Sequence, residues 1–297
     1  MSRPPLAAYL CLAASMALVG GYIALSKALV AAFPVFLLAW LRFAIAAAAM
    51  PHWLVRAPGE PPLSPRDRRL LFWESFIGNF LFSMCMLAGV AATSAVAAGV
   101  VMSAMPAAVA LLSRVMLGDR ISARVALAIG CAAAGIGTMA LARSTGAVQP
   151  APWWGYALLL AAVFCEACYV VIGKQLTAQV SPRRISALIN LWGLALMTPL
   201  GLWQLQGFGL GAVQPGTWSL LVFYALAASI VSVWLWMRGL RDVPAPQAGV
   251  FSVLLPVSSA LVGVYALGEP FSGAHLVAFA LSIGGLLLAT WPARVPS

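Results

Sequence analysis

Two charged side chains stand inside long apolar runs of the sequence, and they are the residues best placed to do chemistry. Glu166 lies thirteen residues into the run Trp153–Ile172, and Arg42 lies about nine residues into the run Phe33–Val55. A charge in apolar surroundings is costly, so each side chain is expected to face a cavity or a partner. Glu166 can carry a coupling proton or bind an ammonium group, and Arg42 can clamp a carboxylate through two parallel hydrogen bonds. A purely structural role is the alternative for both residues.

The other reactive side chains predict neither a metal site nor a catalytic centre. Cys165 and Cys168 form a C-x-x-C pair without a second ligand pair, so they are expected to be small helix residues. His52 and His275 lie near the ends of two different apolar runs. The sequence contains no paired-acid constellation, nucleophile elbow or phosphate loop. We therefore expect no catalytic residue, no metal and no cofactor.

The composition indicates an all-α integral membrane protein. Hydrophobic residues make up 63% of the chain and charged residues only 8%, about a third of the share usual in soluble proteins. The continuous Ala, Leu and Val runs differ from the alternating pattern of a transmembrane β-barrel. The net charge of +10 is spread between these runs singly or in short groups, which argues against a nucleic-acid partner. The expected surroundings are the lipid bilayer.

Ten apolar runs are long enough to cross a bilayer, which takes about 20 residues each. The first run is expected to be a span rather than a cleavable signal peptide. The polar connection His52–Arg69 contains four prolines and predicts an extended loop. The ten predicted transmembrane helices are Leu6–Leu25, Phe33–Val55, Leu70–Ala91, Ala95–Met116, Arg124–Leu141, Trp153–Ile172, Ile185–Leu205, Trp218–Trp236, Gln247–Leu267 and Ala274–Trp291.

The distribution of Lys and Arg predicts that both termini lie in the cytoplasm. With the N-terminus inside, fourteen of the seventeen basic residues fall at cytoplasmic helix ends, and only Lys27 and Arg143 fall outside. Lys27 and Lys174 stand at helix ends, where they are expected to snorkel toward water. Glu74, near the cytoplasmic end of the third helix, is expected at the membrane interface rather than in a pocket.

One stretch of the chain occurs twice. Ala98–Gly135 matches Ala248–Gly285 at a constant offset of 150 residues, and the first two helices of each half agree at an offset of 147. Five helices is an odd number, so the second half would enter the membrane from the opposite side. We therefore expect two inverted five-helix repeats, residues 1–145 and 146–297. Such repeats place a site near the midplane and permit alternating access by rocking one half against the other.

The residues expected to line that central cavity are polar, aromatic or close to two prolines. A proline frees backbone carbonyls one turn before it, so Pro106 and Pro256 are expected to act as paired hinges. For the polar members, interhelical hydrogen bonding is the alternative role. The predicted cavity residues are Tyr22, Asn79, Ser83, Met102, Ser103, Met105, Glu166, Tyr169, Asn190, Ser252, Leu255 and Trp236.

Two acids follow the proline-containing helices. Asp119 and Glu269 are expected to cap the helix that comes after each of them, with gating as the alternative. The fifth and tenth runs carry mostly small residues, which permits close packing against neighbours or a second copy. Both a monomer and a homodimer remain open.

Two sequence patterns carry a family resemblance. The stretch from Ala17 to Lys27, followed by Trp40-Leu-Arg-Phe, resembles the start of an EamA-type domain of the drug/metabolite transporter superfamily. Each repeat ends in a stretch similar to the family's "P…LGE.(L)S" pattern, first with Leu117-Gly-Asp-Arg-Ile-Ser and then with Leu267-Gly-Glu-Pro. Asp119 replaces the usual Glu, and Pro270 stands where a basic residue is common. The resemblance covers essentially the entire chain as two tandem domains.

The resemblance implies ten helices, cytoplasmic termini and export of small-molecule metabolites across the bacterial inner membrane. Size and pattern are similar to amino-acid exporters, including the aromatic-amino-acid type, and a generic drug or metabolite efflux carrier is the alternative. Arg42 matches the family's arginine, which favours a common structural role. A polytopic membrane enzyme and a channel are less favoured, because the catalytic constellations and the pore-facing charges are missing.

Overall fold

The fold is described from a computed structural model, and every structural statement below concerns its described residues. These are residues 6–102, 104–105, 108–109, 111–112, 127, 130–131, 134–135, 138, 151–176, 179–242, 251, 254–269 and 271–290. The side chains of residues 174, 240–242, 282, 286 and 288–290 are not among them. Ser103, Pro106, Asp119 and Ser252 therefore lie outside the described part of the chain.

The described residues form helices and connecting segments, with no strand among them. Proline opens three of the helices at the first position, where its missing N–H leaves no hydrogen bond unmade. The helices are α1 (Leu6–Ala32), α2 (Val35–Ala49), α3 (Pro65–Ser75), α4 (Phe82–Ala92), α5 (Ala95–Met102), α8 (Trp153–Leu176), α9 (Pro182–Leu205), α10 (Pro215–Leu226), α11 (Ser232–Asp242), α13 (Leu254–Leu267) and α14 (Gly273–Thr290).

Short 3-10 and π segments complete the helical pattern. The π segments η2 (Phe76–Leu81) and η4 (Ala227–Val231) join α3 to α4 and α10 to α11 without a break. The 3-10 turns are η1 (Pro51–Trp53) and η3 (Leu210–Ala212). Each π segment therefore lies in the middle of one long continuous helix.

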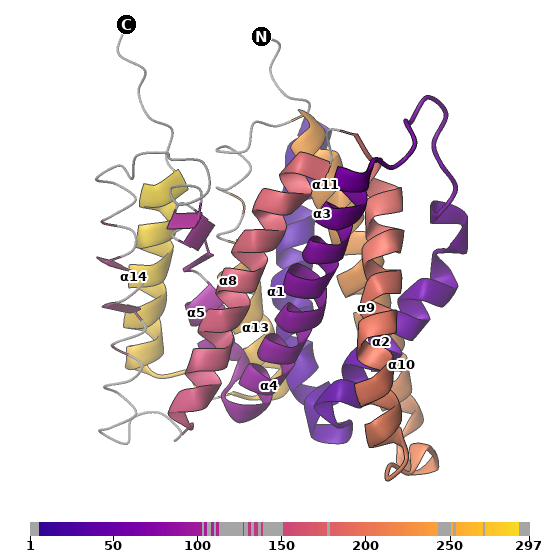
Figure 1. Cartoon of the computed structure of the whole chain (residues 1–297). Coiled ribbons are helices and arrows are strands. Elements are labelled where there is room, and N and C mark those ends of the chain that lie inside the picture. Colours follow the sequence, from indigo (N-terminus) through magenta and orange to yellow (C-terminus); the bar gives the residue numbers. More distant parts are fainter. Residues whose placement is uncertain are drawn as a thin grey trace, which may run out of the picture.

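Five of the described helices are long and apolar enough to cross a membrane. They are Leu6–Ala32, Pro65–Ala92, Trp153–Gly173, Pro182–Leu205 and Pro215–Gly239, and three shorter apolar helices accompany them, Val35–Ala49, Leu254–Leu267 and Gly273–Gly285. These helices are consistent with an all-α membrane protein. Figure 1 shows them running side by side as a bundle, with α14 beside α5 at one flank.

Several predicted boundaries are wrong. Helix α1 continues to Ala32 instead of ending at Leu25, and α2 ends at Ala49 instead of Val55. The expected loop His52–Arg69 ends early, because α3 begins at Pro65. Ser64 caps this helix: its hydroxyl accepts from the Asp67 N–H at 3.1 Å, and the Asp67 carboxylate accepts from the Ser64 N–H at 3.0 Å. A proline that opposes a helix interior is well tolerated at this first position.

Two helices distant in sequence pack antiparallel along their whole length. On the rod formed by α3, η2 and α4, residues 74, 78 and 89 face residues 173, 169 and 159 of α8 in turn. Glycine permits each approach: a Cβ added to Gly78 would lie 2.6 Å from the Cβ of Tyr169, and one added to Gly89 would lie 2.8 Å from Leu159 Cδ2. Small residues let helix backbones meet closely in a bilayer, where van der Waals packing drives association.

The contact between α1 and α13 is closer still. A Cβ on Gly20 would lie 2.1 Å from the Leu255 carbonyl oxygen and 2.1 Å from the Ser258 hydroxyl. Around this crossing, an apolar cluster contains Ile23, Val101 and Met102. The α1–α13 crossing thus ties the N-terminal helix to the C-terminal part of the chain.

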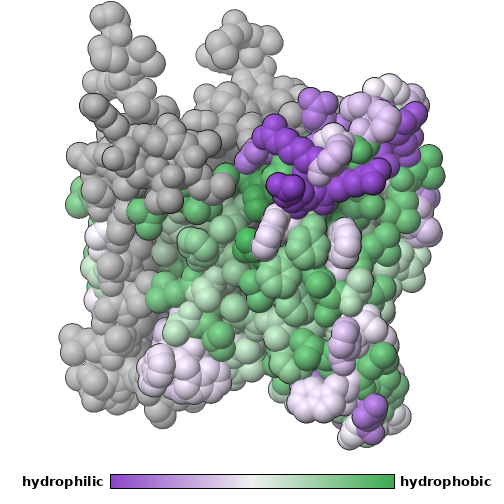
Figure 2. Space-filling view, in the orientation of Figure 1, coloured by the Kyte–Doolittle hydropathy of each residue, from purple (hydrophilic) through white to green (hydrophobic). Residues whose placement is uncertain are grey.

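Polarity on the surface is concentrated at one end of the bundle. Figure 2 shows a hydrophobic side wall and a hydrophilic group at the end where α3 begins. There the Arg184 guanidinium pairs with the Glu60 carboxylate at 3.0 Å, and Arg66 donates to the Gln175 amide oxygen at 3.0 Å. Large apolar residues such as Trp203 (63% exposed) and Tyr265 (84% exposed) lie on the outside of the bundle. Such a surface suits lipid surroundings.

Candidate functional site

A cavity of about 70 Å³ lies among helices from both halves of the sequence. Segments α1, α2, η2, α4, α8, α9, η4 and α11 contribute its walls, together with Met105. By this measure about 10–15 Å³ is enough to hold one water molecule, so the space is large enough for several. Its lining residues are Ser15, Met16, Val19, Tyr22, Arg42, Gly78, Asn79, Phe82, Met105, Glu166, Tyr169, Val170, Ile189, Asn190, Ala228, Ser229, Ser232, Val233 and Trp236.

Arg42 is buried and is held entirely by neutral groups. From α2 its guanidinium donates to the Asn79 amide oxygen at 3.1 Å, to the Ser83 hydroxyl at 2.7 Å and, more weakly, to the Ser229 hydroxyl at 3.4 Å. The same group lies 4.1 Å from the ring centroid of Phe43, a cation–π contact. Its Nε has no hydrogen-bond partner. The site therefore holds a positive charge whose described neighbours include no carboxylate.

The two π segments supply two of the groups that hold this guanidinium. Asn79 lies in η2 and Ser229 lies in η4. A π turn rotates the side chains that follow it relative to a regular α-helix, which is why such turns recur at functional sites. The Asn79 amide also donates to the Ile189 carbonyl at 3.2 Å, so α9 fixes the orientation of the amide.

Asn190 leaves an acceptor available at the same wall. Its amide nitrogen donates to the Ser186 carbonyl at 2.8 Å, whereas its side-chain oxygen is buried without a partner. The Ser186 hydroxyl in turn donates to the Ser229 carbonyl at 2.8 Å. An unused donor on Arg42 and an unused acceptor on Asn190 thus border one cavity, which suits a polar ligand.

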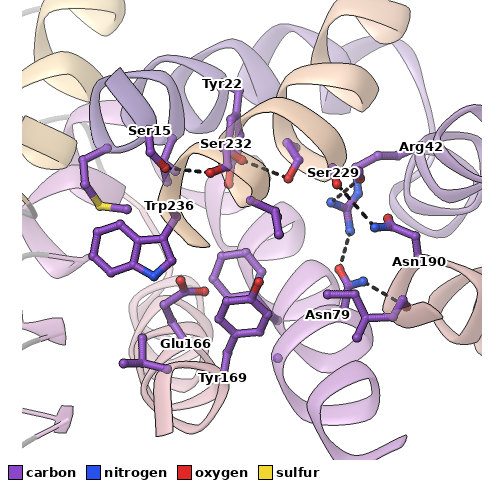
Figure 3. Close-up of a pocket in the computed structure, with 18 of the residues that line it drawn as sticks. Ser15, Tyr22, Arg42, Asn79, Glu166, Tyr169, Asn190, Ser229, Ser232 and Trp236 are labelled. Carbon is purple, nitrogen blue, oxygen red and sulfur yellow. Dashed lines mark hydrogen bonds between the residues drawn. The ribbon is translucent and has the colours of Figure 1, made fainter. Parts of the chain in front are cut away.

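Glu166 lies on the other side of the cavity from Arg42. Figure 3 shows its carboxyl group beside Trp236 and Tyr169, while Arg42 lies with Asn79 and Ser229. No ion pair joins Glu166 to Arg42 in the part of the chain that the structure describes. The cavity therefore has a guanidinium on one wall and a carboxyl group on another.

Most predicted cavity residues with a described position do line this space. They are Tyr22, Asn79, Met105, Glu166, Tyr169, Asn190 and Trp236. Ser83 contacts Arg42 from behind and does not form the wall. Met102 and Leu255 were expected in the cavity, but they pack in an apolar cluster with Ile23 because their helices meet α1 tightly there. Pro256 is buried in the first turn of α13, and the hinge role predicted for it and Pro106 is untested.

Sequence reasoning missed several cavity residues. Ser15 and Ser232 face each other, with the Ser15 hydroxyl donating to the Ser232 carbonyl at 2.8 Å. Ser229 and Ser232 are polar residues inside an apolar run, a signal of the same kind as that of Asn79. The repeat gives a sharper signal, because Ser229 lies 150 residues after Asn79. The apolar lining residues, such as Met16, carried no signal of their own.

Lys27, which was expected to snorkel toward water, caps the end of a helix instead. The Lys27 ammonium donates to the carbonyls of Val90, Ala91 and Thr93 at 2.9, 3.1 and 2.6 Å, at the C-terminal end of α4. Both positive charge and donors are favourable at that end of a helix dipole. This contact replaces the expected snorkelling.

Glu269 caps a helix, although not the one expected. Its two carboxylate oxygens accept from the N–H groups of Ala95 and Val96 at 2.9 and 3.0 Å, at the start of α5. The helix that follows Glu269 is α14, so the prediction named the wrong partner. The cap joins the C-terminal part of the chain to the corner between α4 and α5.

Comparison with known proteins identifies the family of this chain. The chain matches the EamA-like transporter family twice, over residues 6–141 and 153–291. It is 32% identical to "Uncharacterized transporter YetK" of Bacillus subtilis (strain 168) over 99% of this chain and 90% of that protein. It is 25% identical to "Uncharacterized transporter YyaM" of the same organism over 87% of this chain and 85% of that protein. Neither name gives a substrate.

A solved structure shares the fold. Its title is "Crystal structure of protein", and it aligns with a TM-score of 0.66 over 97% of both chains at 23% identity. No group of three or more metal-ligand side chains occurs among the described residues.

The two family matches together span nearly the whole sequence. The chain belongs to the EamA-like transporter family of the drug/metabolite transporter superfamily, whose members are integral membrane transporters.

Proposed function

We propose that this chain exports small amino acids from the cytoplasm, across the bacterial inner membrane. The observation that carries the proposal is the pair of unpaired opposite charges, Arg42 and Glu166, on separate walls of one cavity. A zwitterion offers a carboxylate and an ammonium group, one for each wall. A guanidinium with a free Nε suits a carboxylate, and a half-buried Glu that lines the cavity suits an ammonium group.

The size of the cavity favours a small solute over an aromatic one. A space of about 70 Å³ holds only a few water-sized groups, which suits the smallest amino acids better than an aromatic one. Tyr22, Tyr169 and Trp236 then surround the solute as a non-polar wall. An aromatic amino acid would need the cavity to widen.

Alternating access between inverted halves is the proposed mechanism. Two family matches support the duplication, and the halves contribute corresponding residues to one cavity: Tyr22 with Tyr169, and Asn79 with Ser229. Five spans per half would invert the second half and leave both termini in the cytoplasm. Pro106 and Pro256 are the proposed hinges.

A generic drug or metabolite efflux carrier is the second candidate. The observation that favours it is the apolar share of the wall, including Met16, Phe82 and Trp236. Apolar and flexible side chains accept varied amphiphiles. In that case the substrate needs neither charge.

Uptake into proteoliposomes separates these possibilities. We expect saturable transport of radiolabelled glycine, L-alanine or L-serine, recovered chemically unchanged, with weaker transport of L-phenylalanine. Flux that does not saturate would indicate a channel, and altered solute would indicate an enzyme. If no amino acid is carried while organic cations or uncharged amphiphiles are, the amino-acid proposal is wrong and the efflux carrier stands.

A further inference from the structure

Glu74 is a second buried carboxyl group, outside the cavity. It lies in the last turn of α3, just before η2, and its exposed fraction is 0%. The sequence placed it at the membrane interface rather than in a pocket, and the structure adds that its side chain is buried between helices and does not line the cavity. Neither of its carboxyl oxygens has a hydrogen-bond partner. An ionised carboxylate is strongly disfavoured in such a place, whereas the protonated acid is tolerated.

The surroundings of Glu74 form a contact between the two halves of the sequence. Across from it on α8 is Gly173, where an added Cβ would lie 2.8 Å from Glu74 Oε1. One turn further along α8, Tyr169 packs on Gly78. Tyr169 also lines the cavity, and its hydroxyl is buried without a partner. A line of contacts therefore runs from Glu74 to the cavity wall.

Toward the polar end of the bundle the same contact reaches water within a few turns. Leu71 packs with Ile172 and Leu176. Beyond this apolar layer, the Arg66–Gln175 hydrogen bond lies at the exposed end of the α3–α8 contact. The α3–α8 contact thus has a solvated edge, an apolar layer, the Glu74 carboxyl and then the cavity. Separation of α3 from α8 would bring water to Glu74.

We propose that Glu74 is a proton-binding site that couples transport to the pH gradient. The proposal rests on the proposed alternating access. With α3 and α8 in contact, the carboxyl holds a proton. When the halves part on the cytoplasmic side, water reaches the group and the O–H bond breaks, releasing the proton to the cytoplasm and leaving a carboxylate. After the contact closes with the solute in the cavity, Glu74 regains a proton from the outer side through the cavity next to Tyr169, so each transport cycle carries one proton into the cytoplasm.

Few charged groups face Glu74. From α8 the facing titratable residue is Tyr169, and Lys174 follows Gly173 with its side chain outside the described part. From α9, Arg184 is engaged with Glu60 and Arg183 is exposed. The Arg238 side chain of α11 is exposed, and α3's own Arg68 and Arg69 are exposed as well. Proton release therefore depends mainly on access of water to the carboxyl.

The test compares Glu74→Gln with wild type in two transport modes. Counterflow of L-alanine, at equal pH on both sides, needs no net proton movement, so we expect it to be retained. Acceleration of export by an imposed pH gradient should disappear. Glu60→Gln, at the polar end of the bundle, is the matched control and should keep the acceleration. An unchanged gradient response in Glu74→Gln would overturn the proposal.

Infrared spectroscopy gives a readout that needs no substrate. The wild-type spectrum minus that of Glu74→Gln at neutral pH should contain the C=O stretching band of a protonated carboxylic acid. A carboxylate band in its place would overturn the proposal. If the wild type carries none of the amino acids tested, the proposed function fails, and the infrared difference still decides the protonation of Glu74. Glu74→Asp, which keeps an acid, should restore part of the gradient response.

Discussion

At the residue scale, the cavity is defined by a guanidinium whose described contacts are all to neutral groups. Asn79, Ser83 and Ser229 orient Arg42 without neutralising it. Buried charges are normally paired, so an exception points to a ligand. The environment of Arg42 is thus consistent with both roles considered from the sequence, because hydrogen bonds fix the group and leave its charge available.

Replacing Arg42 tests this interpretation. Arg42→Gln should weaken binding of carboxylate-bearing solutes by about 10- to 100-fold, since a hydrogen bond to a charged group contributes about 1.5–3 kcal/mol. Arg42→Lys should recover little, because a lysine cannot reach three acceptors and a ligand together. Competition binding against L-alanine measures the loss. Ser83→Ala, behind the guanidinium, is the milder control, and an unaltered affinity in Arg42→Gln would contradict the carboxylate role.

Glu166 should select for the ammonium group. In Glu166→Gln we expect L-alanine to lose its advantage over lactate, which lacks the ammonium, because the neutral amide no longer attracts a cation. The ratio of their inhibition constants in an export assay measures this preference. Correct folding is checked by size-exclusion chromatography. If wild type and variant show the same preference, Glu166 does not take part in recognising the ammonium group.

The ion pair at the polar end predicts a pH dependence of stability. Burial raises the pKa of Glu60, but hydrogen bonds from Arg184, Ser181 and the Ala57 amide outweigh it and hold the pKa below its ordinary value of 4.5. A lowered folded-state pKa stabilises the fold above about 4.5, and this contribution is lost as pH falls through the folded-state value. The melting temperature of the wild type should therefore be higher than that of Glu60→Gln at neutral pH. In acid the two melting temperatures should become equal. A constant difference across that range would exclude the ion pair as its source.

At the element scale, glycines set which helices can touch. Gly20 and Gly21 are neighbours on α1, yet a Cβ on Gly20 would overlap the α13 backbone, whereas one on Gly21 would meet Val262 at an ordinary 4.0 Å. Sequence periodicity could not separate these two residues, because both stand in an apolar helix of small residues. The distinction depends on where α13 crosses, which is a tertiary property.

This pair makes a matched stability experiment. Gly20→Ala should destabilise the fold by about 1–3 kcal/mol, as overpacking does, because the overlapping atoms are backbone and cannot move aside. Gly21→Ala should be neutral or slightly stabilising, since alanine favours helix. Apparent melting temperatures in detergent measure both. Equal melting temperatures would show that α1 and α13 are not in this close contact.

The elements show clearly what the sequence could and could not predict. Apolar runs located the long helices, because hydrophobic length is a strong signal in a membrane protein. They could not reveal η2 and η4, since a π turn leaves no mark on hydropathy. Glu166 and Arg42 were found because charge inside an apolar run is conspicuous. Glu74 lies near a run's end, and only the packing of α8 shows that its side chain is buried.

At the scale of the whole molecule, orientation in the membrane is testable without a substrate. The cytoplasmic termini proposed from charge would place Pro58 inside and Gln206 outside, and both residues are exposed. In a cysteine-free background, a membrane-impermeant maleimide added to intact cells should label Gln206→Cys and not Pro58→Cys. Permeabilised cells should label both. Labelling in the reverse pattern would invert the proposed topology.

The cavity walls also record how the two halves have diverged. At the repeat spacing of 147 residues, the counterpart of Arg42 is Ile189 and the counterpart of Glu166 is Val19, and all four line the same cavity. Each charge therefore exists in one half only. A chain made of two first halves would hold two guanidiniums and no acid, and one made of two second halves would hold the reverse. Recognition of a solute with both charges could arise only after the ancestral halves ceased to be interchangeable.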